Sequence, residues 1–427
     1  MKHLFKIIFI IIFSFSFNES EANTLIDSLN LAYKNNLKLN AERASMRATR
    51  EEKREAVSEF LPSVTVSGYV GEQENTNPGT DTNFRPSEQS ITVEQKLFQG
   101  FGGVANFEKK KNGQALGEFK LKKVEQQTLL EAAEVHTELL LNRKKVNINL
   151  MNIDLLERQV ETDQNRLEKG EISLTDLAQS ESSLAGAQAE LIAAQNDLVT
   201  SIANFEKIIG KRPADNIEDV SQINLNLPKS LAESYKISTL ENPDLQIALL
   251  EYKQAKSDVI IAGSEFSPSA TLSYKIAEQD DISSTVKDRT QQTVTATATW
   301  PLFSGGSNLF NLRKYQEIRM QKELLYQDAK KQSETDVTNA WSSYQSSKSV
   351  LDSIKSQVKA AEIASEGITL EYESGSNRTT LEVIQSRSIL LNSRINLASY
   401  ERNFLISQFK ILAAIGRLTS KQLNLKE

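Results

Sequence analysis

Apolar and polar residues follow two different patterns along this chain of 427 residues, and each pattern occurs twice. In four short segments every second residue is apolar, which is typical of β-strands with one apolar face. The other face carries hydroxyl or charged side chains, a pattern found in strands that cross an outer membrane. The polar stretches 72–88 and 278–292 separate the members of each pair and are expected to be loops. The four expected strands cover about 63–72, 89–98, 269–277 and 292–300.

Helical periodicity occupies most of the remaining chain. The apolar spacing predicts one helix over residues 24–60 and another over 231–266, each ending before a proline. Long proline-free helices are expected at about 103–168 and 308–373. At 1.5 Å per residue each long helix would reach on the order of 100 Å. The return helices carry apolar residues seven positions apart, which predicts a coiled coil with a neighbouring helix. These residues are Leu177, Leu184, Leu191, Leu198 and Phe205 in the first return helix, and Ile384, Leu391, Ala398, Leu405 and Leu412 in the second.

The order of these elements is the same in both halves of the chain, which indicates an internal duplication. The motif Leu-Phe-Gln-Gly that ends at Gly100 has a counterpart, Leu-Phe-Ser-Gly, that ends at Gly305, about 205 residues later. The turn at Gly170 has its counterpart at Gly375. We therefore divide the chain into a first repeat, a linker, a second repeat and a C-terminal tail. Their expected bounds are 23–210, 211–230, 231–416 and 417–427.

Residues 1–22 have the features of a bacterial signal peptide. Lys2 and Lys6 accompany an apolar stretch that is too short for a comfortable membrane helix. Small residues, Ser20 and Ala22, then stand at the positions that a signal peptidase recognises. We expect export and cleavage near Ala22; the alternative is an uncleaved N-terminal anchor.

Composition excludes several classes of function. The net charge is -6 and the charged residues are mixed in sign, so no sustained basic face suggests nucleic acid as a partner. The chain has no cysteine, which excludes disulfide bonds and thiolate metal sites. Beyond the expected signal peptide His136 is the only histidine, and one histidine without cysteine forms neither a zinc site nor a Cys/His dyad. We therefore expect no cofactor, no metal and no enzymatic activity.

Four strands are too few to close a barrel, because about eight is the smallest useful number. An open sheet in lipid would expose unpaired backbone groups, at roughly several kcal/mol each. If the strands cross a membrane, copies of the chain must join, and two would give about eight strands and three about twelve. The alternatives are a soluble sandwich for the strands and a coiled-coil rod for the helices. Aromatic residues near the strand ends suit a membrane-interface belt, and they are Tyr69, Phe98, Phe101, Trp300 and Phe303.

The sequence after the expected signal peptide resembles the TolC-like outer-membrane factors of multidrug efflux and type I secretion. The resemblance rests on the duplicated order of elements, on the motif Asn-Pro-Asp-Leu at 242–245, and on the Ile-Gly endings at Gly210 and Gly416. It implies a mixed, mainly α fold in which a homotrimer forms a 12-stranded β-barrel in the outer membrane of a Gram-negative bacterium. The helices would form an α-helical tunnel through the periplasm. The implied partners are a periplasmic adaptor protein and an inner-membrane ABC or proton-driven pump, which supplies the energy for a passive channel.

In this family the tunnel closes at its periplasmic end through polar links between helices. The resemblance assigns Asp176, Tyr372 and Arg378 to these links, and it assigns Glu382 and Gln385 to the constriction, where the best-studied pattern has Asp at both positions. Because Gln385 departs from that pattern, a ring with three fewer charges should attract cations less strongly. The alternative for Asp176 and Glu382 is that they only stabilise helix starts. The two turns match the adaptor-contacting tips of the family, and their residues are Lys169, Gly170, Glu171, Ser374, Gly375, Ser376 and Asn377.

One alternative function remains open at this point. A periplasmic coiled-coil scaffold could use the strands only for assembly and conduct nothing. Alternating strands with one apolar face favour the channel over this scaffold. The sequence identifies neither the cargo nor the particular pump and adaptor.

Overall fold

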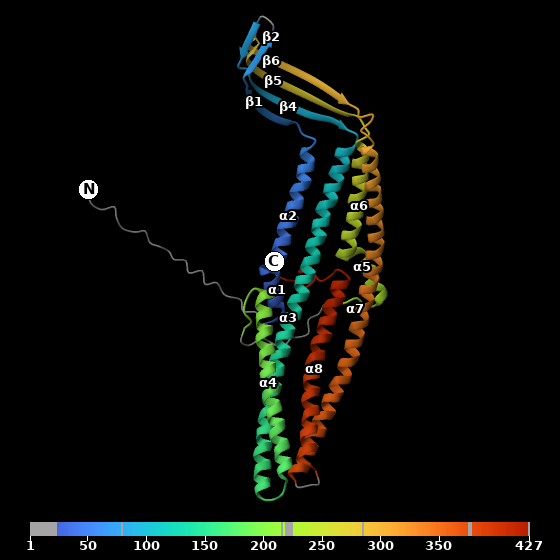
Figure 1. Cartoon of the computed structure of the whole chain (residues 1–427). Coiled ribbons are helices and arrows are strands. Elements are labelled where there is room, and N and C mark those ends of the chain that lie inside the picture. The colour runs from blue at the N-terminus through green and yellow to red at the C-terminus, as the bar shows by residue number, and fades with distance from the viewer. Residues whose placement is uncertain are drawn as a thin grey trace, which may run out of the picture.

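The molecule is long and narrow, with a β-sheet at one end and helices along the rest of its length (Figure 1). The expected signal peptide lies outside the residues that the structure describes. The computed structural model describes residues 24–77, 80–214, 217, 225–283, 286–374 and 378–425.

Four antiparallel strands form the main sheet in the order β1-β4-β5-β6, so β1 and β6 are its edges. A separate hairpin of β2 and β3 follows a break at Gly71 and Pro86, where the Gly71 N–H donates to the Pro86 carbonyl at 2.8 Å. The strands are β1 (Ser63–Val70), β2 (Gln73–Asn77), β3 (Thr80–Phe84), β4 (Ser87–Gln99), β5 (Ser269–Ser283) and β6 (Val286–Thr299).

The expectation of polar loops at 72–88 and 278–292 is wrong for most of these residues. The first stretch contains the β2–β3 hairpin, and the second consists largely of the paired ends of β5 and β6, where Asp280 lies opposite Asp288. Alternating hydrophobicity reports which face of a strand meets an apolar environment. Backbone pairing, in contrast, continues wherever a neighbouring strand offers its N–H and C=O groups. Both stretches are uniformly polar, so they lack the alternating pattern from which strands are predicted.

The register of the main sheet sorts its side chains onto two different faces. On one face Val66 lies opposite Ile91, and Val93 lies opposite Tyr274, which in turn lies opposite Val294. Val66 is 74% exposed and Val294 is 70% exposed, so the described chain leaves much of this apolar face uncovered. The pairs on the other face are polar, and they include Ser67–Ser90, Thr92–Lys275, Ser273–Thr295 and Thr271–Thr297.

Each repeat begins with two helices where the sequence predicts one, so the expectation of single helices at 24–60 and 231–266 is wrong. The chain is extended at Asn36 and at Asn242, and each side chain accepts a hydrogen bond from the backbone N–H three residues later. Asparagine caps a helix start well, and Pro243 at the first helical position fixes the same break in the second repeat. These helices are α1 (Leu25–Asn35), α2 (Leu37–Ser58), α5 (Leu231–Glu241) and α6 (Pro243–Ser264).

Two very long helices, α3 (Gly102–Glu168) and α7 (Ser307–Glu373), run from the sheet to the far end of the molecule (Figure 1). The return helices α4 (Leu174–Ile209) and α8 (Thr380–Ala414) pack against them as antiparallel pairs. In α4 the buried positions recur every seven residues and hold small side chains, which allow a close approach of α3. They are Ser180, Ala187, Ala194 and Ser201.

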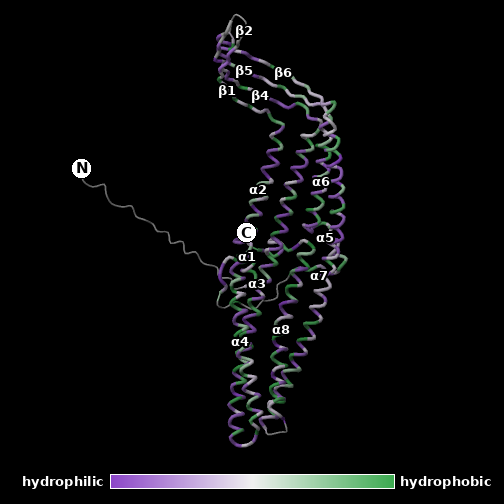
Figure 2. The backbone as a smooth tube through the Cα atoms, in the orientation of Figure 1, coloured by the Kyte–Doolittle hydropathy of each residue, from purple (hydrophilic) through white to green (hydrophobic). Residues whose placement is uncertain are grey.

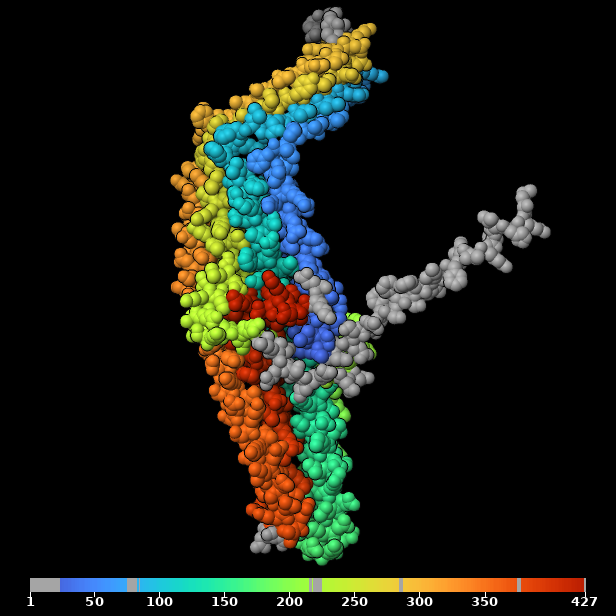
Figure 3. All heavy atoms as spheres, turned by 180° about the vertical axis from the view of Figure 1, so that it is seen from behind, coloured from blue at the N-terminus to red at the C-terminus, as the bar shows by residue number. Residues whose placement is uncertain are grey.

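The largest apolar core lies about halfway along the molecule, where α1, α3, α4 and α8 meet. The C-terminal segment crosses this region, as the dark red atoms in Figure 3 show, and Leu418 contributes to the core. The core thus joins both repeats at one level of the molecule. Other fully buried side chains of the core are Leu129, Leu139, Phe205, Phe409 and Leu412.

Apolar and polar residues are interspersed along all the helices (Figure 2). Of the helices in the described ranges, none is both long enough and apolar enough to pass through a membrane. The helices pack through narrow apolar seams that polar residues flank, as expected for coiled coils.

Candidate functional site at the tips of the long helices

The site assigned from the sequence lies at the end of the molecule opposite the sheet, where α3 turns into α4 and α7 turns into α8 (Figure 1). Gly170 makes the first turn with φ of +73°, a conformation that glycine adopts without strain. Lys169, Gly170 and Glu171 are all exposed there. In the second turn Ser374 is exposed, whereas Gly375, Ser376 and Asn377 lie outside the described residues.

A buried carboxylate, Asp163 of α3, lies two helical turns before the first turn. It is 0% exposed and accepts three hydrogen bonds, from Ser180 Oγ at 2.5 Å, Tyr372 OH at 2.8 Å and Gln159 Nε2 at 2.9 Å. Burying a carboxylate is costly unless hydrogen-bond donors replace its water, and these three donors do so. Because the donors come from α3, α4 and α7, this carboxylate joins three helices.

Tyr372 connects the same carboxylate to the fourth helix. Its hydroxyl donates to Asp163 and therefore accepts from Thr380 Oγ1 of α8, at 3.0 Å. Burial raises the pKa of the phenol, so the hydroxyl keeps its proton. The guanidinium of Arg166 lies over the ring, 4.5 Å from its centroid, which is a cation–π contact.

A second link between α8 and α3 runs through Arg387. Its Nη1 donates to Gln159 Oε1 and to the Leu155 carbonyl, both at 3.3 Å. Burial lowers the pKa of this guanidinium, and the nearby acids Glu373 and Asp163 oppose the effect. We call the connected residues the tip network, and they are Gln159, Asp163, Ser180, Tyr372, Thr380 and Arg387.

Arg378 forms a separate and more exposed cluster at the start of α8. Its guanidinium pairs with Glu371 at 2.6 Å and with Glu382 at 3.0 Å, so it connects the end of α7 to the first turn of α8. The two carboxylates raise the pKa of Arg378. The backbone N–H of Thr379, followed by Arg378, lowers the pKa of Glu382. All three charged groups are substantially exposed, and exposed ion pairs contribute little stability.

Asp176 caps the start of its own helix, α4. Its carboxylate accepts hydrogen bonds from Ser173 Oγ at 2.7 Å and from the Ser173 N–H at 3.0 Å, which completes a capping box at the start of α4. These bonds lower the pKa of Asp176. Glu382 forms the same box with Thr379 at the start of α8, and Gln385 is exposed one turn further on. The sequence assigned Asp176 as the acid of the tips, but within one chain Tyr372 pairs with Asp163.

The sequence analysis did not select Asp163, since a charged residue on a long helix predicts a solvated position. The available signal was heptad spacing, because Asp163 follows the buried Leu156 by seven residues. A charged residue at a core position of a coiled coil indicates a specific partner.

The aromatic residues assigned to a membrane-interface belt divide between two places. Phe98, Phe101, Trp300 and Phe303 lie where the main sheet meets the helices, and all four are exposed by at least 39%. The Phe98 and Phe101 rings contact edge to face, with centroids 5.7 Å apart. Tyr69 lies near the opposite end of β1, opposite Glu88 and therefore on the polar face.

A family model described as outer membrane efflux protein matches residues 28–211 and 235–417. The chain belongs to the outer membrane efflux protein family. The family model matches the chain twice, and the two matched segments overlap the two repeats of the sequence.

Individual members of the family are similar over most of the chain. The sequence is 27% identical over 410 residues to the outer membrane efflux protein BepC of Brucella suis biovar 1 (strain 1330), covering 95% of this chain and 88% of BepC. It is 22% identical over 311 residues to the outer membrane protein TolC of Escherichia coli (strain K12), covering 67% and 62%. The fold matches the CmeC outer membrane channel of Campylobacter jejuni with a TM-score of 0.85 at 14% identity, covering 94% and 90%. It matches CusC with a TM-score of 0.82 at 16% identity, covering 92% of both chains.

Proposed function

We propose that this protein is an outer-membrane efflux channel that passively conducts substrates from an inner-membrane pump to the exterior. Membership of the outer membrane efflux protein family supports the efflux role. One structural observation carries the proposal: within the described residues the main sheet has two unpaired edges and an exposed apolar face. Such a sheet needs an apolar environment for its face and further strands for its edges.

We infer that three copies of the chain assemble. Joining β6 of one copy to β1 of the next removes both edges, and an unpaired edge in lipid would cost roughly several kcal/mol for each unsatisfied group. Three copies of four strands give a barrel of about twelve, which leaves a channel, whereas about eight strands would enclose only side chains. In the trimer the apolar face meets lipid and the hydroxyl-rich face lines the pore.

The tip network is proposed to hold the tunnel closed. The hydrogen bonds from Tyr372 of α7 to Asp163 and from Arg387 of α8 to Gln159 join one helical hairpin to the other, and these bonds must break if the two hairpins move apart at the tips. Glu382 and Gln385 are proposed to line the constriction, with Arg378 and Asp176 supporting the closed arrangement. The exposed turns at Gly170 and Ser374 are proposed to meet the periplasmic adaptor protein, through which an ABC or proton-driven pump delivers the cargo.

The conduction of ions by the purified protein tests this function. Protein extracted from the outer-membrane fraction should insert into a planar lipid bilayer and produce discrete conductance steps. A protein that remains in the soluble periplasmic fraction and gives no steps would contradict the proposal and favour the scaffold.

Two neighbouring residues of β1 provide a matched test of which face meets lipid. Val66→Arg places a charge on the apolar face, where the cost is ~2–4 kcal/mol at the membrane midplane, so the yield in the outer membrane should fall. Thr65→Arg places the same charge on the opposite face and should insert normally. Equal yields of the two variants would contradict the assignment of faces.

A further inference from the structure

The four helices nearest the main sheet lie side by side in the order α2, α3, α6, α7 (Figure 1). In the middle of this row α3 packs against α6, and this contact joins the first repeat to the second. The two ends of the row are α2 and α7, and in the described part of the chain they do not pack against each other. Each end helix therefore has one side without a neighbouring helix of the row.

The two repeats can be matched residue by residue in this row, because the corresponding helices have equal lengths. Helices α2 and α6 have 22 residues each and follow a capping asparagine, and α3 and α7 have 67 residues each. The α3–α6 contact within the chain therefore indicates which residues would meet if α7 of one copy packed against α2 of the next.

One ion pair between α3 and α6 has a counterpart in which the charges are exchanged. Lys123 of α3 pairs with Asp244 of α6 at 2.5 Å. The same positions hold Asp328 in α7 and Lys38 in α2, so the acid and the base have changed helices. Lys38 and Asp328 are both exposed, and neither forms an ion pair among the described residues. Each would find a partner of opposite charge in a neighbouring copy.

A second ion pair between α3 and α6 has a counterpart with the charges in the same order. Lys109 of α3 pairs with Asp258 of α6 at 2.7 Å. The same positions hold Lys314 in α7 and Glu52 in α2. Glu52 already pairs with Lys110 of its own chain at 2.9 Å, but its side chain is 49% exposed, which leaves room for a second cation.

Side-chain size is also complementary at a position between the two ion pairs. A Cβ atom on Gly113 of α3 would lie 3.1 Å from Nε2 of Gln254, and this amide donates to the Lys109 carbonyl at 3.3 Å. The long helix thus has the small residue and α6 has the large one. At the same positions α7 has Ile318 and α2 has Ala48, so large and small have changed sides. Opposite charges and matched sizes are the features of a specific contact.

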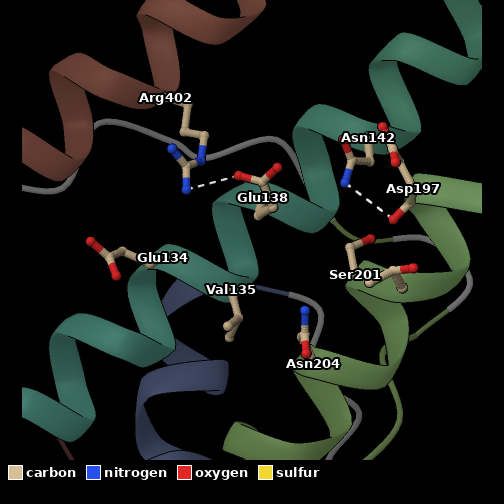
Figure 4. Close-up of a pocket in the computed structure, with 9 residues that line it drawn as sticks. Glu134, Val135, Glu138, Asn142, Asp197, Ser201, Asn204 and Arg402 are labelled. Atoms are coloured by element: carbon tan, nitrogen blue, oxygen red, sulfur yellow. Dashed lines mark hydrogen bonds and ion pairs between the residues drawn. The ribbon is translucent and has the colours of Figure 1, made fainter. Parts of the chain in front are cut away.

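This complementarity is not a general result of the duplication, because it is lost near the middle of the molecule. At the level of the apolar core Arg402 of α8 pairs with Glu138 of α3 at 2.8 Å (Figure 4). Counted from the capping residues of the helices, the same positions hold Asn196 in α4 and Ser343 in α7, which carry no charge. The other two ion pairs between α3 and α8 likewise correspond to uncharged residues.

We propose that α7 of one copy packs against α2 of the next in the way that α3 packs against α6 within the chain. This inference rests on the proposed function, in which copies of the chain assemble. The expected ion pairs between copies are Lys38–Asp328 and Glu52–Lys314.

The exchanged pair makes the contact selective. If α2 of another copy took the place of α6 beside α3, Lys38 would face Lys123. Exposed ion pairs add little stability, but like charges that face each other oppose a contact. The charges therefore direct α2 to α7 of a neighbouring copy and away from α3.

The absence of native cysteine makes chemical linking of chosen positions specific. Lys38→Cys with Asp328→Cys is treated in isolated outer membranes with a short, cleavable bis-methanethiosulfonate linker and then denatured. We expect products of two and three chains, which dithiothreitol returns to single chains. The matched control is Lys123→Cys with Asp244→Cys, which should lose its free thiols to the same extent but remain a single chain.

Charge reversal tests the ion pair itself. Lys38→Asp and Asp328→Lys each bring like charges together at every contact between copies, so each should lower the temperature at which the trimer dissociates. The double variant restores opposite charges and should regain the native temperature. A double variant that is no more stable than the two single variants would overturn the ion pair.

The two experiments also separate this contact from the proposed function. Trimers in native mass spectrometry without any multi-chain product from the Lys38→Cys, Asp328→Cys variant would overturn the α2–α7 contact alone. The absence of trimers from the native protein would overturn the proposed assembly, and the contact would fail with it.

Discussion

Removal of one hydroxyl group, in Tyr372→Phe, tests the role of the tip network most selectively. The substitution keeps the ring and its contact with Arg166, but it removes one of the three hydrogen bonds that Asp163 accepts. The carboxylate remains buried with two donors. Thr380 loses its partner at the same time.

The size of the effect follows from the charge of the acceptor. A hydrogen bond to a charged group contributes about 1.5–3 kcal/mol, more than a bond between neutral groups. If this bond exists only in the closed state, its loss shifts the opening equilibrium of each protomer roughly 10- to 150-fold, since about 1.4 kcal/mol is a factor of ten. A trimer opens further still if its three protomers move together.

Single-channel recording in planar bilayers measures this shift as a longer open time or a larger mean conductance. Tyr326→Phe is the matched control, because Tyr326 lies on the same helix and stacks on Tyr252 near the other end of α7. It should behave as the native protein does. A Tyr372→Phe channel indistinguishable from this control would refute the closing role of the tip network.

Two further predictions concern stability. Burial lowers the pKa of His136 from 6.5 to about 4, so the unfolded chain binds this proton at a higher pH than the folded one. The stability in denaturant should therefore fall as the pH decreases from about 6.5 to about 4, by on the order of 3 kcal/mol, and His136→Asn should remove this dependence. Gly416→Ala should lower the thermal midpoint more than Gly170→Ala. Both glycines have positive φ, but only at Gly416 would a Cβ atom clash with the backbone, at the carbonyl oxygen of Glu241; equal midpoints would contradict this.

The elements with regular periodicity could be predicted from the sequence. The long helices α3 and α7 begin within one residue of the expected positions, since neither contains a proline and both have clear turns at their ends. The break at Asn36 could not be seen in the same way, because the apolar spacing continues through it. In the second repeat the Asn242-Pro243 pair indicates the break, because asparagine caps a helix start and proline favours the first helical position.

The contacts within the candidate site could be predicted from the sequence only in part. Arg378 and Glu382 form an ion pair in the structure, and their separation of four residues is visible in the sequence. Tyr372 belongs to the separate tip network with Thr380, and the closing roles assigned to these residues stay predictions. Asp163 is 209 residues from Tyr372, and only the packing of α3 against α7 brings the two together. Hydrophobic periodicity counts apolar positions only, so it identifies a polar core residue such as Asp163 only when the heptad that contains Leu156 is extended to it.

The number of copies in the assembled protein tests the central claim most directly, because a four-stranded sheet whose edges are unpaired in the described part of the chain needs partners. The measurement is native mass spectrometry of the mature protein released from detergent micelles. We predict a single species with three times the mass of the chain, which dissociates only when the sheet unfolds. A stable monomer that stays dispersed in detergent-free buffer would contradict the account.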